Sequence, residues 1–216
     1  ELSAARRAIT RQYGDGAADR LPQGIPAVTM ALGGVLSYLY DTQKTALSYI
    51  NTLDYYEQGQ FMELDIAARR NLELTETLRS KEKRGSLLWV LDKTKTPMGS
   101  RCLRAFLEGP LLSPAAIARR QHAVGALVDN TMAREELILA LTGMGDMERL
   151  ISRIVYGTAG GRDLTALRAA IEKLPAVAQQ LRPFTSGRLG ELSREMDLLS
   201  DLRDKIAAAI VDEPPF

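Results

Sequence analysis

The chain has 216 residues, of which 45% are hydrophobic and 25% charged, so it can bury one large core or two unequal ones. Its formal net charge is +1, from 28 Lys and Arg against 27 Asp and Glu, whereas a dedicated nucleic-acid module usually carries a marked basic excess. The composition argues against extensive disorder and against broad attraction to a polyanion. Any contact with DNA must be local or made by parts of a longer protein.

A few features bear on compartment and membrane. The single cysteine, Cys102, cannot close an internal disulfide, which fits a reducing compartment. The longest apolar run, residues 25–36, is well short of the roughly 20 residues that cross a bilayer, so we expect it to form a buried helix. The N-terminal ELSAARRAITRQYG has no initiator methionine and no signal pattern. We expect a cytoplasmic protein, of which this chain is an excised part.

Two helices come first in chain order. Residues 2–13 predict a short helix that stops at Gly14, because glycine tolerates the left-handed turn that ends a helix. Pro26 suits a first helical turn. Apolar residues then recur at helical spacing, namely Val28, Leu32, Val35, Leu39 and Ala46. This pattern predicts one long helix to about Ser48.

The next segment mixes strand and helix signals. Leu53–Tyr56 and Phe61–Leu64 flank the turn-like EQGQ and predict a small β-hairpin. Asp65 can cap a short helix over residues 67–71, since its carboxylate accepts free N–H groups of the first turn. The segment LELTETL, residues 72–78, is consistent with a third short strand.

Capping residues predict where the later helices begin. Residues 79–85 carry four basic side chains and one Glu, so we expect a loop, closed by Ser86 at the start of the next helix. Hydroxyl or carboxylate caps predict four further helix starts, at Thr96-Pro97, Ser113-Pro114, Asp146 and Asp163.

Apolar stripes predict which helix faces are buried. One helix carries Met98, Cys102, Phe106, Leu103 and Leu107. Another carries Leu164, Leu167, Ile171 and Leu174, and Pro175 should end or kink it. Over residues 189–210 the apolar spacing alternates three and four, as in one helix packed along its length.

The helix over residues 114–128 should place Ile117, Val124 and Val128 in the core and Arg119-Arg120 on its wet face. Taken together, these patterns predict a mainly α fold. We expect a multihelical core domain with a small β-hairpin or short antiparallel strands near residues 53–75.

No pattern in the sequence is typical of catalysis or cofactor binding. The phosphate-binding G-x-x-x-x-G-K pattern is absent, and we interpret Gly85-Ser86 and GTAGG at 157–161 as turns before helices. The lone His122 has no second histidine or cysteine at ligand spacing, and nucleophilic catalysis around it would need an unseen spatial arrangement. We therefore predict no catalytic, cofactor-binding or metal-binding residue in this chain.

Basic pairs and loops are the remaining candidates for contact with phosphate. They are Arg69-Arg70 and the loop residues Arg79, Lys81, Lys83 and Arg84. Short charge runs usually face water, which is the default interpretation here. Alternatively, the guanidinium groups of Arg69 and Arg70 could bond carbonyl groups and fix the junction between a helix and a strand.

Several segments resemble one known family. The phrases DIAARRNLEL and LDKTKTPMGSRCLR, within residues 61–110, resemble the core domain of the MutS family of bacterial DNA mismatch-repair proteins. Upstream, LSYLYDTQKTALSYI resembles the join between the connector and core domains of that family. Downstream, GDMERLISRIVYGTAGGRDLTALRAAI and LRDKIAAAIVDEPPF are similar to the rest of the core. The resemblance implies that residues 1–44 end a connector domain and that residues 45–216 are core, without clamp or long lever helices.

The resemblance also implies a parent protein with other working parts. Family members bind mismatched duplex DNA as dimers and hydrolyse ATP with magnesium through domains absent here, and a MutL-type repair partner is expected. The family reads mismatches with a Phe-x-Glu motif in an N-terminal domain, so we interpret the triplet Phe61-Met62-Glu63 as structural.

Three functional hypotheses follow. The first is a structural and allosteric relay, not itself an enzyme, that links ATP state to DNA grip in the parent, a DNA-dependent ATPase. The isolated chain should then expose a large apolar patch where lever helices would pack. The second is a freestanding helical module that binds a protein partner or DNA directly. The third, an enzyme with acidic pairs converging near His122, is the least favoured.

Overall fold

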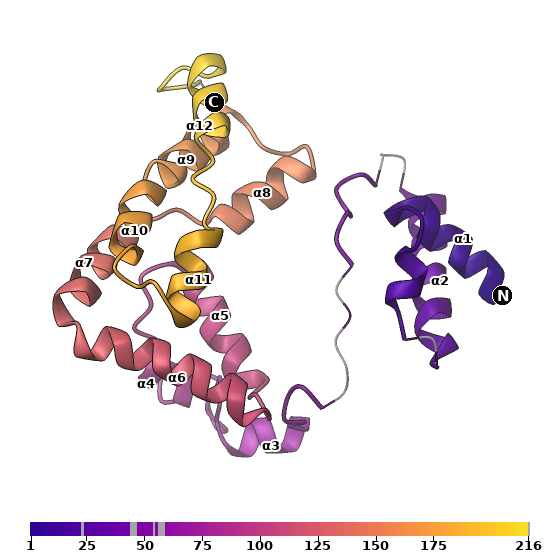
Figure 1. The fold of residues 1–216 in the computed structure, drawn as a ribbon, viewed down its shortest axis with the longest axis horizontal. Coiled ribbons are helices and arrows are strands. Elements are labelled where there is room, and N and C mark those ends of the chain that lie inside the picture. The colour runs from indigo at the N-terminus through magenta and orange to yellow at the C-terminus, as the bar shows by residue number, and fades with distance from the viewer. Residues whose placement is uncertain (23, 44–46, 54, 56–58, 216) are drawn as a thin grey trace. The chain divides into compact units, whose positions relative to one another are not determined.

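Helices make up most of the computed structural model, which describes residues 1–22, 24–43, 47–53, 55 and 59–215. The chain separates into two units, Glu1–Glu57 and Gln58–Phe216 (Figure 1). The expected division at residues 44 and 45 refers to the connector and core domains of the resembled family, and it stays a prediction.

Unit 1 is built from α1 (Leu2–Tyr13), the 3-10 helix η1 (Ala17–Arg20) and α2 (Pro26–Thr42). The predicted helix over residues 2–13 is confirmed, and it ends before Gly14, whose φ is +85°. A small core joins the elements, with the side chains of Ile9 and Leu36 fully enclosed. α1 and α2 touch at Gly33, where an added Cβ would lie 2.4 Å from Ala5 Cα.

The second predicted helix ends earlier than expected, at Thr42 instead of about Ser48, although residues 44–46 lie outside the described residues. The chain folds back instead, because the side-chain amide of Gln12 donates to the carbonyls of Leu47 and Ile50 at 2.8 and 2.7 Å. Leu47 is buried there. The run 25–36 was expected to be buried, but only one face of α2 is covered, and Val35 is 56% exposed.

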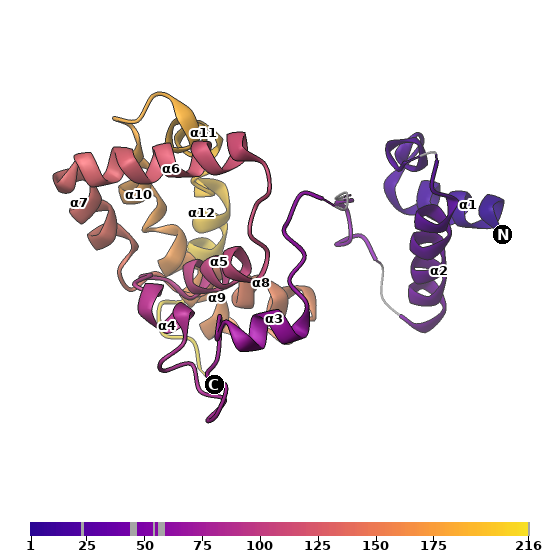
Figure 2. The same cartoon turned by 90° about the horizontal axis from the view of Figure 1, so that it is seen from below.

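Unit 2 is entirely helical in its regular elements among the described residues, and Figure 2 shows it from a second side. Its helices are α3 (Ile66–Asn71), α4 (Leu87–Leu91), α5 (Pro97–Glu108), α6 (Pro114–Asp129), α7 (Thr131–Leu141), α8 (Met147–Val155), α9 (Gly161–Ile171), α10 (Leu174–Leu181), α11 (Gly187–Glu195) and α12 (Ser200–Ala209). Their side-chain caps at Asp65, Ser86, Thr96, Ser113 and Asp146 confirm the predicted helix starts.

Two apolar clusters hold unit 2 together. One joins α6, α7, α10 and α11 around Val177 and Leu181, and the other joins α8, α9 and α12 around Leu167, Ile171 and Ile206. The predicted stripe on α9 is therefore confirmed. The helix ends at Ile171, and Pro175 lies in the first turn of α10.

The predicted β-hairpin is not supported. Residues 54 and 56–58 lie outside the described residues, and Phe61 forms a single antiparallel bridge with Leu111 instead of a strand. The prediction of a third strand over residues 72–78 is also wrong. The carbonyls of Glu73 and Leu74 accept hydrogen bonds from the first amides of α4, those of Leu87 and Leu88, at 3.0 and 2.9 Å. These bonds occupy the groups that a strand partner would need.

Two predicted helix boundaries are also wrong. The helix expected over residues 189–210 is broken between α11 and α12, where Leu199 adopts φ +50° and its amide donates to the Asp197 carboxylate at 2.9 Å. This local bond competes with the helical one. The helix expected to start at Asp163 starts earlier, after Gly160, and Asp163 contributes to its cap from the third helical position. Its carboxylate lies one turn in and accepts from the Gly160 amide at 2.9 Å.

The face of α6 that enters the core differs from the expected one. Ala123, Ala126 and Leu127 pack inward, while Val124 and Val128 are exposed. Small side chains allow neighbouring helices to approach α6 closely, which selects the alanine face.

The arginines of α6 are not simply solvated. Arg119 pairs with Glu191 of α11, and Arg120 lies over the ring of Phe106, 3.7 Å from its centroid. On α5, Cys102 and Phe106 are exposed, so the predicted stripe is only partly buried.

Candidate coupling junction around Asp92 and Arg101

The segment LDKTKTPMGSRCLR forms a dense polar junction between α4, α5 and α8. Asp92 directly follows α4, and its carboxylate accepts from Lys83 Nζ at 2.5 Å, Thr94 Oγ1 at 2.6 Å and Ser100 Oγ at 2.7 Å. The bonds from Lys83 first, and then from the hydroxyls of Thr94 and Ser100, hold the pKa of Asp92 well below its usual range. One side chain thus ties the basic loop, α4 and the first turn of α5 together.

Arg101 makes the next link, from α5 to the start of α8. Its guanidinium donates to both oxygens of Asp146, at 2.8 and 2.6 Å, and to Glu148 Oε2 at 2.8 and 2.5 Å. Asp146 also accepts from the Arg149 amide at 3.2 Å and so caps α8. The bonds from Arg101 lower the pKa of Asp146, and the two carboxylates raise the pKa of Arg101. Forked arginine pairs of this kind fix orientation as well as distance.

A second ion cluster joins α6 to α11. Glu191 accepts from Arg119 of α6 and, at 3.2 Å, from Arg188 of its own helix. The bond from Arg119 is the main cause that lowers the pKa of Glu191. Both clusters join helices that lie far apart in the chain.

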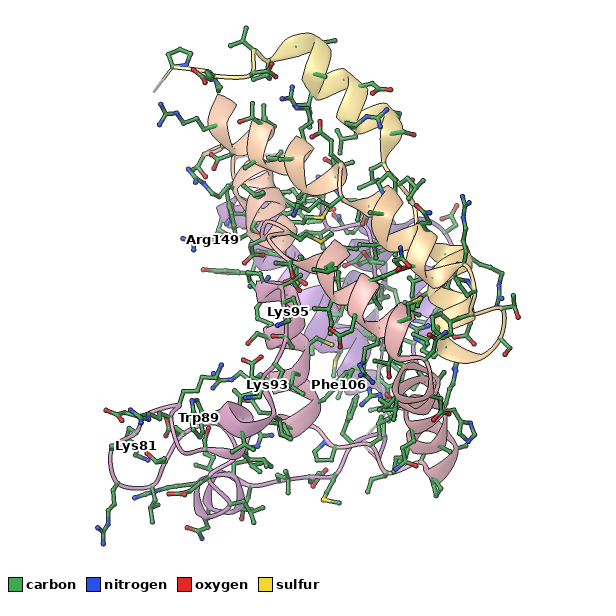
Figure 3. The ribbon with its side chains drawn as sticks, turned by 90° about the vertical axis from the view of Figure 1, so that its left-hand side faces the viewer. Lys81, Trp89, Lys93, Lys95, Phe106 and Arg149 are labelled. Atoms are coloured by element: carbon green, nitrogen blue, oxygen red, sulfur yellow. The ribbon has the colours of Figure 1, made fainter. Side chains whose placement is uncertain are left out.

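Three basic side chains lie on the surface beside the junction. Lys93 and Lys95 come from the loop between α4 and α5, and Arg149 lies at the start of α8 (Figure 3). All three side chains are exposed. The junction therefore has a bonded interior and a cationic rim.

The predicted phosphate candidates have mixed surroundings. Arg69 donates to the Leu64 carbonyl at 2.9 Å, so it bonds a carbonyl as the alternative expected, but at the start of α3 and not at a junction with a strand. Lys83 pairs with Asp92, and Lys81 approaches Glu76 at 3.3 Å. Arg70, Arg79 and Arg84 are exposed, with no ion pair among the described residues. Contact of these residues with phosphate stays a prediction.

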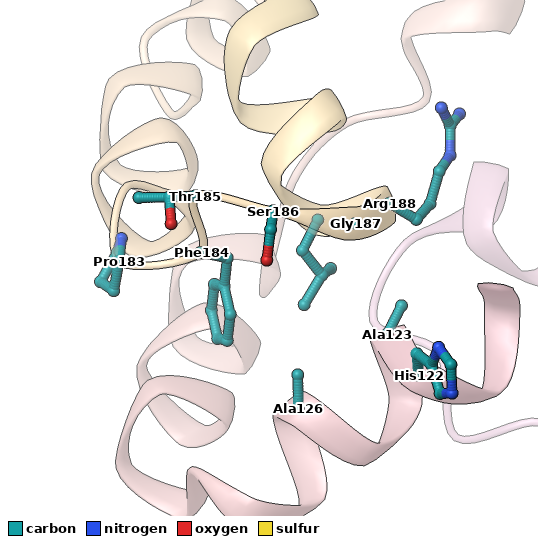
Figure 4. Close-up of a pocket in the computed structure, with 10 residues that line it drawn as sticks. His122, Ala123, Ala126, Pro183, Phe184, Thr185, Ser186, Gly187 and Arg188 are labelled. Atoms are coloured by element: carbon teal, nitrogen blue, oxygen red, sulfur yellow. The ribbon is translucent and has the colours of Figure 1, made fainter.

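His122 lines a cavity of about 450 Å³ between α6 and the segment that enters α11 (Figure 4). The wall also includes Phe184, Ser186 and Arg188. No Asp or Glu is among the described lining residues, so a hydroxyl, imidazole and carboxylate are not brought together there. Across all residues that the structure describes, no group of three or more His, Cys, Asp or Glu could hold a metal ion. The prediction of no catalytic, cofactor or metal residue stays a prediction.

The triplet Phe61-Met62-Glu63 lies in the strap that precedes α3. The Met62 amide donates to the Pro110 carbonyl at 2.7 Å, and the Phe61 ring lies against Gly109. These contacts give Phe61 a packing role. Of the strand expected over residues 61–64, the structure has only the single bridge between Phe61 and Leu111.

Asp92 and Arg101 lie in the segment LDKTKTPMGSRCLR, but the sequence alone predicts no role for either residue. A short-range signal existed for Asp92, because an Asp directly after a helix and two residues before Thr is typical of a local turn. No such signal existed for Arg101, whose partners lie 45 and 47 positions away.

Comparison with known proteins supplies the family. Residues 67–216 match the family described as MutS domain III. The chain belongs to the MutS family. It is 46% identical over 186 residues to the DNA mismatch repair protein MutS of Lachnoclostridium phytofermentans, covering 86% of this chain and 20% of that protein. It is 36% identical over 219 residues to the MutS protein of Halalkalibacterium halodurans, covering 97% of this chain and 25% of that protein.

A third relative, the MutS protein of Desulforamulus reducens, is 46% identical over 190 residues, covering 88% of this chain and 22% of that protein. The MutS segment thus spans about a fifth to a quarter of the length of these relatives. In the described part of the chain, no helix has both the length and the apolar character needed to cross a membrane.

Proposed function

We propose that this MutS segment is a structural relay within a mismatch-repair protein and has no catalytic site of its own. Membership of the MutS family and the match to domain III support the setting. Close-packed helices move as bodies and transmit displacement, which suits a relay. The forked contact of Arg101 with Asp146 and Glu148 is the observation that carries the proposal, because it locks α5 to α8.

The activities of the whole protein are part of the same proposal. We propose that parts outside this segment bind mismatched duplex DNA and hydrolyse ATP with magnesium, and that the protein acts in the cytoplasm as a dimer with a MutL-type partner. The printed names of the relatives, which are DNA mismatch repair proteins, support this assignment.

Arg101→Ala tests the relay in the full-length protein that contains this segment. Without the fork, α5 and α8 lose their shared anchor, so DNA should stimulate ATP hydrolysis less while the rate without DNA stays unchanged. Lys205→Ala, at an exposed position on α12, is the matched control. Amide hydrogen exchange in α8 reports whether the anchor was released. Released α8 amides together with intact stimulation would refute the relay.

An exposed apolar face on α6 and α7 gives the relay a site for contact with other parts. Val124 and Val128 share one side of α6, and Met132 and Leu139 share one side of α7, all exposed. We propose that helices of the longer protein cover this face. The isolated chain should then self-associate, and Leu139→Ser should reduce the association in sedimentation experiments. A monomeric chain at high concentration would argue against such a cover.

The second candidate function is a freestanding module that binds DNA or a protein partner directly. The basic loop of residues 79–84, which lies beside the junction, is the observation that supports this second function. An electrophoretic titration of the 216-residue chain with duplex DNA separates DNA binding from the relay, because phosphate contacts release counterions and weaken steeply with salt. We expect no shift, and salt-sensitive binding at micromolar protein would favour the direct binder.

A further inference from the structure

Basic charge is concentrated in one short segment. Residues 79–104 contain eight Lys and Arg and two Asp and Glu, a net charge of +6, so the rest of the chain sums to −5. One of the two acids, Asp92, is already engaged by Lys83. This segment of an almost neutral chain therefore has a local excess of positive charge, part of which is paired with acids outside it, as in Lys81 with Glu76 and Arg104 with Glu108.

Two cations of this segment, Lys93 and Lys95, have no ion pair within the described parts of the chain. Arg149 of α8 is also exposed and has no ion pair there, although its charge adds to the bonds from Arg101 that lower the pKa of Asp146. Many other arginines of unit 2 are paired with carboxylates, among them Arg101, Arg104, Arg153, Arg168, Arg188 and Arg203. Figure 3 shows Lys81, Trp89, Lys93, Lys95 and Arg149 along the same side of unit 2, and we call these five residues the basic strip.

Ion pairs connect the parts of the basic strip. Lys83 and Asp92 join the loop of Lys81 to the loop of Lys93 and Lys95. Arg101 joins the start of α5 to the acids that flank Arg149 in α8. The junction thus fixes the backbone segments that carry the strip, and a ligand would have to order only the exposed side chains.

Apolar side chains accompany the cations. Of the five residues of α4, only Leu88 is buried, while Trp89 is 48% and Val90 54% exposed. Leu87 and Leu91 are exposed as well. A cluster of large apolar side chains on a surface rimmed by charge is typical of an interaction site.

We propose that the basic strip and α4 bind an acidic segment of a partner protein that carries aliphatic or aromatic side chains between its carboxylates. Carboxylates of the partner would pair with Lys93, Lys95 and Arg149, and its apolar side chains would cover Trp89 and Val90. The chemistry favours protein over nucleic acid. Aliphatic side chains neither stack on bases nor bond phosphate, and a single tryptophan is a poor platform for several bases.

Trp89 reports binding directly because it is the only tryptophan in the chain. The probe is a synthetic peptide of Glu and Asp interspersed with Leu and Phe, titrated into the 216-residue chain at physiological salt. We expect a saturable blue shift of Trp89 emission. The double variant Lys93→Glu with Lys95→Glu should weaken binding about tenfold, since two attractive pairs become repulsive. The control variant, Lys205→Glu, should bind like the original chain.

Other outcomes overturn the proposal. If the acidic peptide does not shift the emission of Trp89, the proposal is wrong. If a control peptide with Ser in place of Leu and Phe binds equally well, the apolar side chains of α4 do not contribute to binding. Tighter binding of duplex DNA, lost in the same double variant, would assign the basic strip to nucleic acid instead. Circular dichroism of both variants confirms that weaker binding does not come from unfolding.

Discussion

Asp92→Asn removes one negative charge from the junction while keeping the size of the side chain. The Asp92 side chain is 11% exposed and accepts from Lys83, Thr94 and Ser100. A hydrogen bond to a charged group contributes about 1.5–3 kcal/mol, and the neutral amide loses the pair with Lys83 while keeping an acceptor for one hydroxyl. We expect the free energy of unfolding to fall by about 2 kcal/mol near pH 7.

The loss of stability caused by Asp92→Asn should depend on pH and become smaller in acid. The pKa of Asp92 lies well below its usual range in the folded chain, chiefly because of the bond from Lys83. Its charge therefore stabilises the fold fully above the pKa of an unfolded aspartate, about 3.9, and this contribution is lost as the pH falls toward the folded pKa. Asn cannot titrate. The stability difference between the two proteins should thus shrink by about 1.4 kcal/mol per pH unit below about pH 4.

Urea unfolding followed by circular dichroism at about pH 7 and about pH 3 measures this difference, which should drop by about 1 kcal/mol at the lower pH. Asp201→Asn, at an exposed position on α12, is the matched control and should change stability little at either pH. If Asp92→Asn costs the same at both pH values, the charge of Asp92 does not stabilise the junction and the reasoning fails.

Two further predictions concern packing. Gly33→Ala would place a Cβ 2.4 Å from Ala5 Cα, so it should destabilise unit 1 by about 1–3 kcal/mol in urea unfolding. Gly34→Ala meets open space and should be neutral or stabilising by up to about 1 kcal/mol, and equal losses would refute the close contact. Leu167→Ala should lower the unfolding free energy by about 3 kcal/mol. The exposed control Leu72→Ala should cost under about 0.5 kcal/mol, and similar values for both would contradict the core assignment.

Features with a short-range cause were predictable from sequence. A cap needs only one side chain and an amide three positions on, so Asp65, Ser86 and Thr96 marked true helix starts. The stripe on α9 was equally visible, because three turns of apolar residues form one face, which packs against α8 and α12. The family resemblance rested on phrases in order and spacing, and the match over residues 67–216 confirms it.

Features with a competing partner were not predictable from sequence. The helix expected to run to Ser48 ends at Thr42, and the chain then folds back to Gln12, 35 positions from Leu47. The stripe of Val124 and Val128 has valid helical spacing but faces solvent, because α6 offers a second apolar face made of smaller side chains. Periodicity identifies apolar faces and cannot decide which one a neighbour covers.

The junction shows why the candidate site escaped local reasoning. Within the segment 92–101, Asp, Thr and Ser are common in helix caps, and Lys and Arg are common on any surface, so the sequence predicts only a helix start at Thr96. The site exists because Arg101 meets two acids that begin a helix far along the chain. Such a contact joins two helices and cannot be inferred from the sequence of either helix alone. A relay needs contacts of this kind, since bonds within a single helix cannot transmit its displacement to another.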